Sequence, residues 1–475
     1  MSDTKIPSKP VSSLNAADRL GTEPVGKLLL RFSVPAITGM LVQSLYNVVD
    51  RIFIGHGVGE TALGGIALAM PIMNFAMAFA MLFGVGAANM ISMRLGQGRK
   101  EEAENALNHC FFLLLGIGIV LMVVGLVFLE QLLSVLGAQE GSEALDYTRG
   151  YIRIIFIGTV FSMIGFGFSH CTRAQGFPAV TMIGMILGAV LNIILDAIFI
   201  FGFHWGVEGA AWATIISQLV SALFMLRFIL SKKAVVKLRP KAIKPSLEIT
   251  KHIMSFGSAP FLLHFVMTGV QLLQNISMGW YGSDALGVDN GGDIALSGMN
   301  IIGSIAMFFF MPIFGVNQGA QPILGYNYGA KQFDRVLKTY LRAITTAVII
   351  ATTGFTLTML FPYQLIGIFT HEGSEALMSF TPNAMRVFFI MMPLNGFQII
   401  SANLFIVTGR PKITIFLSML RQFLVLIPCM LIFGRVWGLW GVVSSIPVAD
   451  GFAFCITGIM IYFELKKLRG ASIKL

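Results

Sequence analysis

Polar side chains recur at helical spacing inside otherwise apolar stretches of this 475-residue chain. The run VQSLYNVVDR brings Gln43, Asn47 and Asp50 to one face of a helix, because residues four and seven positions apart share a face. The run LNIILDAIFI does the same for Asn192 and Asp196. Such groups are costly inside a membrane span, so we interpret them as functional candidates.

Two of these candidates are acids on separate helices. If Asp50 and Asp196 face each other in a low dielectric, both cannot easily stay ionised. Either one carboxyl group takes a proton and the pair titrates as a unit, or a small cation lies between them. The Asn192 amide and the hydroxyl of Thr214, one helical turn before Gln218, would add oxygen ligands suited to Na⁺. The residues leave both H⁺ and Na⁺ open.

The composition indicates which elements position these side chains. Hydrophobic residues make up 56% of the chain and charged residues 12%, with a mean hydropathy of +0.79; soluble domains carry roughly 25% charged residues. The apolar stretches are continuous rather than alternating, which disfavours a β-barrel. We therefore predict an all-α polytopic membrane protein, and exclude a soluble enzyme and a secreted disulfide scaffold. The first 26 residues are polar and lack an apolar core followed by a cleavage site, so we expect no signal peptide.

Twelve apolar runs in the sequence are long enough to span a membrane. We place them at 32–56, 62–92, 106–129, 149–172, 179–203, 208–230, 253–280, 294–325, 336–361, 382–408, 413–433 and 441–463.

The loops between these runs alternate in charge. Lys and Arg gather in both tails and in the loops after even-numbered runs, whereas the odd-numbered loops are acidic, with Glu140, Asp289 and Glu372 as examples. Positive residues stay on the cytoplasmic side, so we predict that both termini are cytoplasmic. This asymmetry accounts for the net charge of +10. The basic residues are dispersed and lack aromatic interleaving, so no nucleic-acid partner is expected.

The chain repeats itself. Residues 65–100 recur as 294–331, and residues 151–182 recur as 384–419, at offsets of 231 to 233. Six helices separate equivalent positions, so the repeat is parallel, as in transporters that rock two lobes around a central site. The expected organisation is a cytoplasmic tail (1–26), an N-lobe (27–230), a basic linker (231–251), a C-lobe (252–463) and a second cytoplasmic tail (464–475).

Three segments resemble the multidrug and toxic-compound extrusion (MATE) transporters: PAITGMLVQSLYNVVDRIFIG (35–55), LNIILDAIFIFG (191–202) and GVEGAAWAT (206–214). The resemblance covers essentially the whole chain. It implies a monomer in the bacterial inner membrane that exchanges H⁺ or Na⁺ for bulky, often cationic organic compounds, with no cofactor beyond the coupling ion. The family's N-lobe ion site matches Asp50, Asn192, Asp196 and Thr214. Helices 7 and 10 carry amides where some branches carry acids, so the chain looks like the bacterial branch whose acids lie in the N-lobe.

The same resemblance and the intramembrane polar groups together suggest a substrate cavity. Flexible Met side chains and aromatic rings suit binding of varied organic cations. One acid of the C-lobe, Asp450, is open to two interpretations, a carboxylate hydrogen-bonded within its lobe or a site for a cationic substrate. The expected lining is Gln43, Tyr46, Asn47, Gln218, Met73, Met77, Gln271, Gln274, Asn275, Met299 and Asp450.

Other functions remain as alternatives. A flippase for lipids or lipid-linked oligosaccharides from the same superfamily is the nearest, although such proteins tend to line the cavity with Arg and Lys, which are few in these spans. No HExxH, CxxC or GxSxG motif suggests an enzyme. A passive channel would not need a titratable pair of acids.

Overall fold

The computed structural model describes residues 16–135, 143–239, 246–287, 290–369 and 375–473, and this part of the chain consists of helices joined by short connections. The helices are α1 (Asp18–Thr22), α2 (Val25–Gly57), α3 (Glu60–Gly96), α4 (Lys100–Val127), α5 (Leu129–Val135), α6 (Glu143–Ala174), α7 (Pro178–Asp196), η2 (Ala197–Gly202), α8 (Gly206–Leu230), α9 (Leu247–Leu286), α10 (Gly291–Gly329), α11 (Phe333–Leu360), α12 (Pro362–Gly367), α13 (Glu375–Phe389), α14 (Met392–Val407), α15 (Pro411–Met419), η4 (Leu420–Leu426) and α16 (Ile427–Ile473).

The predicted all-α membrane architecture is confirmed. Ten of the described helices are long and apolar enough to cross a membrane alone, and α13 and α14 form one further span bent by 44°. Within α16 the chain leaves helical geometry at Gly438 (φ 58°, ψ −136°), which separates the last two predicted spans. That dihedral pair is accessible mainly to glycine. Most of the observed helices begin before the predicted boundary, by up to seven residues in α2 and α13, whereas several, such as α4, α8 and α11, end at or just before it.

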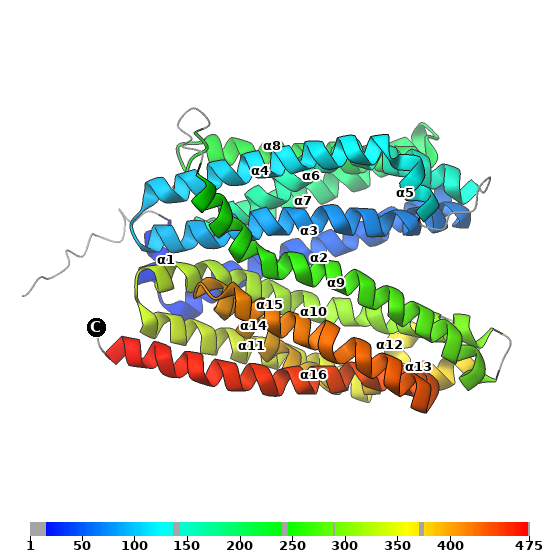
Figure 1. The fold of residues 1–475 in the computed structure, drawn as a ribbon. Helices are drawn as coiled ribbons and strands as arrows, with labels where there is room; N and C mark the ends of the chain where they lie inside the picture. The colour runs from blue at the N-terminus through cyan, green and yellow to red at the C-terminus, as the bar shows by residue number, and fades with distance from the viewer. Residues whose placement is uncertain (1–15, 136–142, 240–245, 288–289, 370–374, 474–475) are drawn as a thin grey trace, which may run out of the picture.

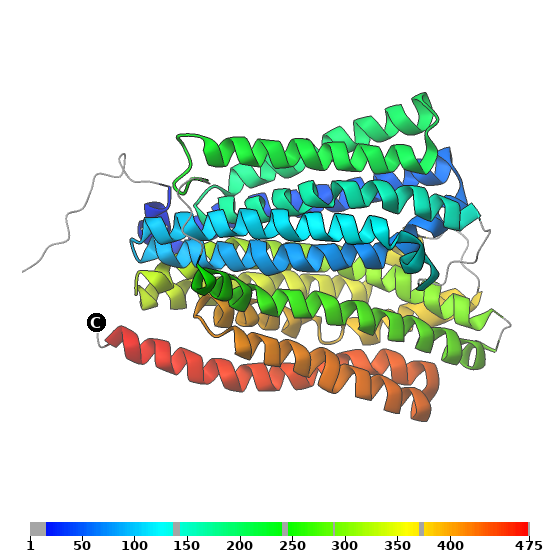
Figure 2. The ribbon, with the colours of Figure 1, turned by 45° about the horizontal axis from the view of Figure 1, so that its top comes forward.

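The spans form two lobes, as Figure 1 shows. Helices α2 to α8 make one layer and α10 to α16 the other, and Figure 2 shows the same division after rotation. The first helix of each lobe, α2 or α9, packs against the opposite lobe, because α2 contacts α10 and α9 contacts α3. The tail and loop residues 1–15, 136–142, 240–245, 288–289, 370–374 and 474–475, which include Glu140, Asp289 and Glu372, lie outside the described residues.

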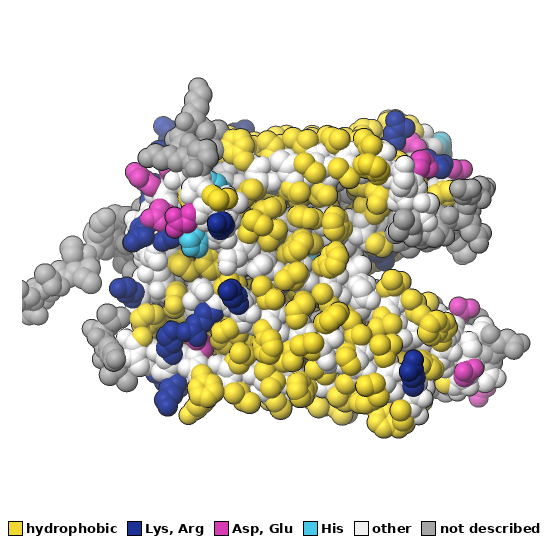
Figure 3. Space-filling view, viewed as in Figure 1, with side chains coloured by type: hydrophobic (Ala, Val, Ile, Leu, Met, Phe, Trp, Pro, Cys, Tyr) yellow, Lys and Arg dark blue, Asp and Glu magenta, His cyan; other side chains and the backbone are white. Residues whose placement is uncertain are grey.

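The two ends of the bundle differ in charge and in packing. Lys and Arg side chains gather mainly at the end that carries the C-terminus, together with acidic ones, whereas acidic side chains with fewer Lys and Arg lie at the other end, where Figure 3 shows a cleft between the lobes. We call these the basic end and the acidic end. At the basic end the lobes touch backbone to backbone, since a Cβ on Gly96 would overlap the carbonyl oxygen of Tyr326 and one on Gly329 that of Met93.

Hydrogen bonds between buried polar side chains join the lobes near the basic end. Gln321 Nε2 donates to Asn89 Oδ1 over 2.8 Å, and Arg173 Nη1 donates to Gln318 Oε1 over 2.5 Å. Arg173 is only 4% exposed. Satisfying such groups across the boundary stabilises the contact, because a buried polar group without a partner is costly. The structure is therefore closed at the basic end and open at the acidic end.

Candidate functional site

Two neighbouring helices of the N-lobe supply the acids. Asp50 lies in the last two turns of α2, and Asp196 is the last residue of α7, directly before the π-helical turn η2. The two helices pack along each other. A π-helical segment widens the turn by one residue and commonly marks a functional position in a helix. The placement of both acids agrees with the helical spacing in the sequence.

The two carboxyl groups meet, and most of their oxygens have no donor. The side chains of Asp50 and Asp196 lie within hydrogen-bonding reach of each other. Asp196 is 0% exposed. Both of its carboxylate oxygens and Oδ1 of Asp50 are buried without a hydrogen-bond partner. Two facing acceptors in a low dielectric need a proton or a cation between them, because otherwise their charges repel without compensation.

Neutral oxygen donors lie nearby. Asn192, one helical turn before Asp196 on α7, is 2% exposed and both atoms of its amide lack a partner. Thr214 is 7% exposed on α8, which packs against α7. Among the described residues, no group of three or more His, Cys, Asp or Glu side chains is arranged so that it could hold a metal ion. A bound cation would thus depend on two carboxylates supplemented by amide and hydroxyl oxygens, a set that suits a small hard cation.

Two tyrosines and a cation surround the acid pair. Tyr46, one turn before Asp50, interacts electrostatically with both acids. Tyr151 of α6 does so as well and is 3% exposed, and Arg51 lies within the same field. Sequence reasoning missed Tyr151. The internal repeat offers a signal for it, since the equivalent C-lobe position is Ala384 and the tyrosine is therefore particular to the lobe that carries the acids.

The amide side chains predicted to line the cavity are mostly accessible. Gln43 and Asn47 on α2 are exposed, as are Gln271 and Asn275 on α9. Amides that face lipid are unfavourable, so we expect these exposed amides, which lie on the first helix of both lobes, to face water. Half-buried positions are those of Tyr46, Met73, Met77, Gln218 and Gln274.

Two residues expected in the cavity lie elsewhere. Met299 is 6% exposed and packs within the hydrophobic cluster of the C-lobe, so it does not line the cleft. Met299 lies in a run of α10 that is rich in Met and Phe, and the sequence of that run does not show which face of the helix packs against the core. Asp450 is 2% exposed and is likewise not a wall of the cleft.

Asp450 belongs to a closed polar network in the C-lobe. Its Oδ1 accepts from Arg421 Nε over 2.6 Å, its Oδ2 from Asn395 Nδ2 over 2.9 Å, and its carbonyl oxygen from Gln398 Nε2 over 2.7 Å. Every acceptor of this acid is thus occupied, in contrast to Asp196. Of the two interpretations of Asp450, the structure supports hydrogen bonding within its own lobe. Arg421 was missed, although it is a lone cation in an apolar run.

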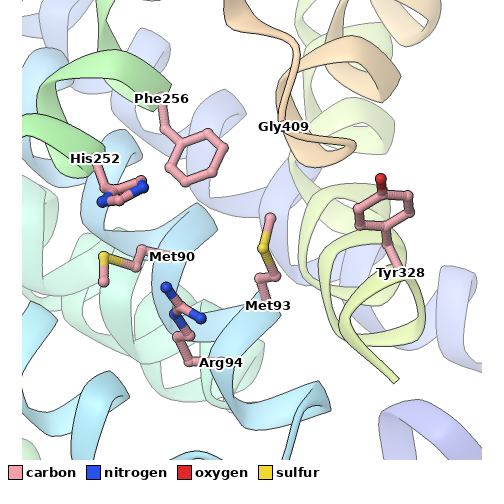
Figure 4. Close-up of a pocket in the computed structure, with 7 residues that line it drawn as sticks. All are labelled: Met90, Met93, Arg94, His252, Phe256, Tyr328 and Gly409. Atoms are coloured by element: carbon pink, nitrogen blue, oxygen red, sulfur yellow. The ribbon is translucent and has the colours of Figure 1, made fainter. Parts of the chain in front are cut away.

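A separate cavity of about 230 Å³ lies at the basic end. Figure 4 shows Met90, Met93 and Arg94 of α3 facing His252 and Phe256 of α9. The cavity therefore spans the boundary between the lobes, on the side away from the acid pair.

Comparisons with known proteins agree with this arrangement. The chain is 28% identical to the multidrug export protein MepA of Staphylococcus aureus (strain NCTC 8325 / PS 47) over 448 residues, which cover 94% of this chain and 95% of that protein. It is also 28% identical over 451 residues to MepA of Staphylococcus saprophyticus, with the same coverage. These relatives are transporters, not enzymes.

Solved structures give the same result. The outward-facing structure of a multidrug resistance MATE family transporter matches with a TM-score of 0.87 at 27% identity, covering 95% of this chain and 98% of that chain. A transporter from Pyrococcus furiosus, described as having a binding pocket of reverse polarity, matches with a TM-score of 0.88 at 26% identity, again covering 95% and 98%. The MatE family model matches residues 35–198 and 260–431. The chain therefore belongs to the MATE family of multi-span membrane transporters.

Proposed function

We propose that this protein is a cation-coupled antiporter that exports bulky, often cationic organic compounds across a bacterial plasma membrane. The observation that carries the proposal is the meeting of Asp50 and Asp196, with three of their four carboxylate oxygens buried and unpartnered. A site that needs a positive charge, inside a lobe that flanks an open cleft, is what exchange of an ion for a cationic compound requires.

The orientation follows from charge. Positive residues stay on the cytoplasmic side of membrane proteins, so the basic end is the cytoplasmic end and both termini are cytoplasmic. The cleft at the acidic end then opens outward, as in the outward-facing relative. Transport requires a second state in which the basic end opens and the acidic end closes, that is, alternating access to one central region.

Coupling comes from competition within the N-lobe. In the outward-open state H⁺ or Na⁺ enters the Asp50–Asp196 pair and removes the negative charge that held a cationic compound. The compound leaves outward, the lobes reorient, and the ion is released to the cytoplasm. Ion and compound then lower each other's affinity by the same factor, as linkage demands. Exposed Gln43, Asn47, Gln271 and Asn275 would hold the polar parts of the compound.

A lipid flippase is not favoured. The relatives described above are multidrug transporters, and Arg421, a cation within the C-lobe spans, is already paired with Asp450. A phosphate-bearing lipid would find that cation occupied.

Replacing Asp196 with Asn tests the proposal. Either a pH gradient or a Na⁺ gradient is imposed across the membrane of inside-out vesicles, and the uptake of a fluorescent organic cation into the vesicles is followed. The native protein should respond to one of the two gradients, which identifies the coupling ion. The rate of gradient-driven uptake should fall at least about tenfold in the D196N variant. The reason is that a neutral amide has no negative charge with which to bind H⁺ or Na⁺.

The matched control is Asp284→Asn, which removes an acid that is exposed on α9. It should transport at the native rate. Full gradient-driven uptake by the D196N variant, or uptake that ignores both gradients, would refute cation coupling at this site.

A further inference from the structure

The segment that leads into α2, the first spanning helix of the N-lobe, is bound by the C-lobe. The carbonyl oxygen of Leu20 accepts hydrogen bonds from Asn327 Nδ2 and Arg335 Nη2, each over 3.0 Å. Arg335 Nη2 also donates to the carbonyl oxygen of Glu23 over 2.7 Å. The Leu20 side chain is fully buried in the C-lobe cluster. We call these contacts the N-terminal clasp.

The segment that leads into α9, the first spanning helix of the C-lobe, is bound by the N-lobe. The backbone N–H of Arg239 donates to Asn108 Oδ1 over 2.9 Å, and the N–H of Ser246 donates to His109 Nε2 over 3.0 Å. The other ring nitrogen of His109, Nδ1, lies 2.8 Å from the carbonyl oxygen of Asn105, which can only accept a hydrogen bond. We call these contacts the linker clasp.

The two clasps occupy equivalent positions in the repeat. Glu104 of α4, which pairs with Arg239 over 3.7 Å, precedes Arg335 of α11 by the repeat offset of 231 residues. In each case the third spanning helix of one lobe holds the chain just before the first spanning helix of the other. The clasps differ in chemistry. An acid, an amide oxygen and an imidazole accept in the linker clasp, whereas a guanidinium and an amide N–H donate in the N-terminal clasp.

We propose that these crossed clasps are latches that hold the cytoplasmic end closed and must release before the lobes separate there. The inference rests on the proposed function for the orientation and for alternating access. Both clasps lie at the basic end, where Gly96 and Gly329 bring α3 and α10 into backbone contact. Arg335, Asn327, Asn108 and His109 are positioning residues that set the balance between outward-open and inward-open states.

The geometry connects this latch to the ion site. Leu20 and Glu23 immediately precede α2, and α2 runs as one helix from Val25 to Gly57 with Asp50 near its far end. A change in ion occupancy that tilts α2 therefore moves the segment held by Arg335.

Accessibility of a single cysteine tests the latch. In a chain whose Cys110, Cys171, Cys429 and Cys455 are replaced, Ser92→Cys places a thiol on α3 where Gly325 of α10 covers it, and Ser92 is 1% exposed. A membrane-impermeant maleimide is added to the cytoplasmic side in inside-out vesicles. Arg335→Ala should raise the labelling rate by about tenfold, because the charge-assisted bonds of the closed state are lost.

Matched variants separate a latch from a general loss of structure. Lys338→Ala removes a cation that is exposed one turn further along α11, and it should leave labelling unchanged. Arg335→Lys keeps a donor and should recover part of the effect. In the linker clasp, His109→Leu should raise labelling, whereas His109→Gln retains an acceptor and should raise it less. Unchanged labelling in Arg335→Ala and His109→Leu would overturn the proposal.

A cross-link supplies a variant that preserves the fold. A short bis-methanethiosulfonate, which attaches to each thiol through a disulfide bond, joins Glu23→Cys to Arg335→Cys in the chain without native cysteines, and export should stop until a reductant cleaves those disulfides. Export at the uncross-linked rate would show that the clasp stays closed through the cycle and would refute the latch. Labelling of Ser92→Cys needs neither gradient nor drug, so failure of cation coupling at Asp196 and failure of the latch are distinguishable.

Discussion

Replacing Arg421 with Met tests whether Asp450 is a structural acid. The Asp450 side chain is 3% exposed and its Oδ1 lies 2.6 Å from Arg421 Nε. Removing one partner of a buried ion pair typically costs about 3–5 kcal/mol, because the remaining charge is left uncompensated. The Arg421 side chain is 30% exposed, so solvent screens part of the interaction and we expect the lower limit, about 3 kcal/mol.

The assay is thermal unfolding of the purified protein in detergent. For a chain of 475 residues the entropy of unfolding is about 1 kcal/mol per degree, so Arg421→Met should lower the midpoint by about 3 °C or more. The double variant Arg421→Met, Asp450→Asn removes both charges and should recover most of that loss. Arg435→Met, which removes an exposed cation of α16, is the control and should leave the midpoint unchanged.

A native midpoint in Arg421→Met would refute the reasoning. If, in addition, Asp450→Asn lost drug binding without losing stability, Asp450 would be a substrate site and the ion pair would contribute little.

Two further predictions concern the ends of the bundle. Glu130, outside the membrane-spanning segments, has its pKa lowered by its hydrogen bond to Arg149 (2.9 Å), so the pair's stabilisation is present above the usual Glu pKa of about 4.3 and is lost as the pH falls below it. Glu130→Gln should abolish that acid-dependent loss in a pH series of thermal unfolding, and an identical series in both proteins would contradict the assignment. Gly96→Ala should force α3 away from Tyr326 and raise cytoplasmic labelling of Ser92→Cys severalfold, whereas Gly116→Ala, with open space around it, should not.

Much of the fold could be predicted because membrane spans are encoded locally. An apolar run of about 20 residues satisfies its own backbone only as a helix, so runs such as 106–129 correspond directly to α4. The breaks were harder to predict. The bend between α13 and α14 lies beside Pro393, which lacks the backbone N–H that continues a helix, whereas no proline lies within the π-helical turns η2 and η4 to mark them.

The candidate site was predictable to the extent that it depends on a single helix. Spacing placed Asn192 beside Asp196, and charge arguments paired Asp196 with Asp50. Spacing could not reveal that Tyr151 of α6 lies in the electrostatic field of both acids, or that Arg421 pairs with Asp450, because these residues lie on helices distant in sequence. The roles of these residues in ion coupling stay predictions.

The buried acid of the C-lobe is neutralised by an arginine, whereas the two acids of the N-lobe are not, and this difference affects the electrical work that transport requires. Because Asp450 and Arg421 cancel, the C-lobe carries no net charge at that depth, and moving it through the membrane field does no electrical work there. The electrical work done at these acids in each transport cycle then depends only on whether H⁺ or Na⁺ occupies the pair formed by Asp50 and Asp196. Sensitivity of export to membrane voltage should accordingly follow the charge of the exported compound.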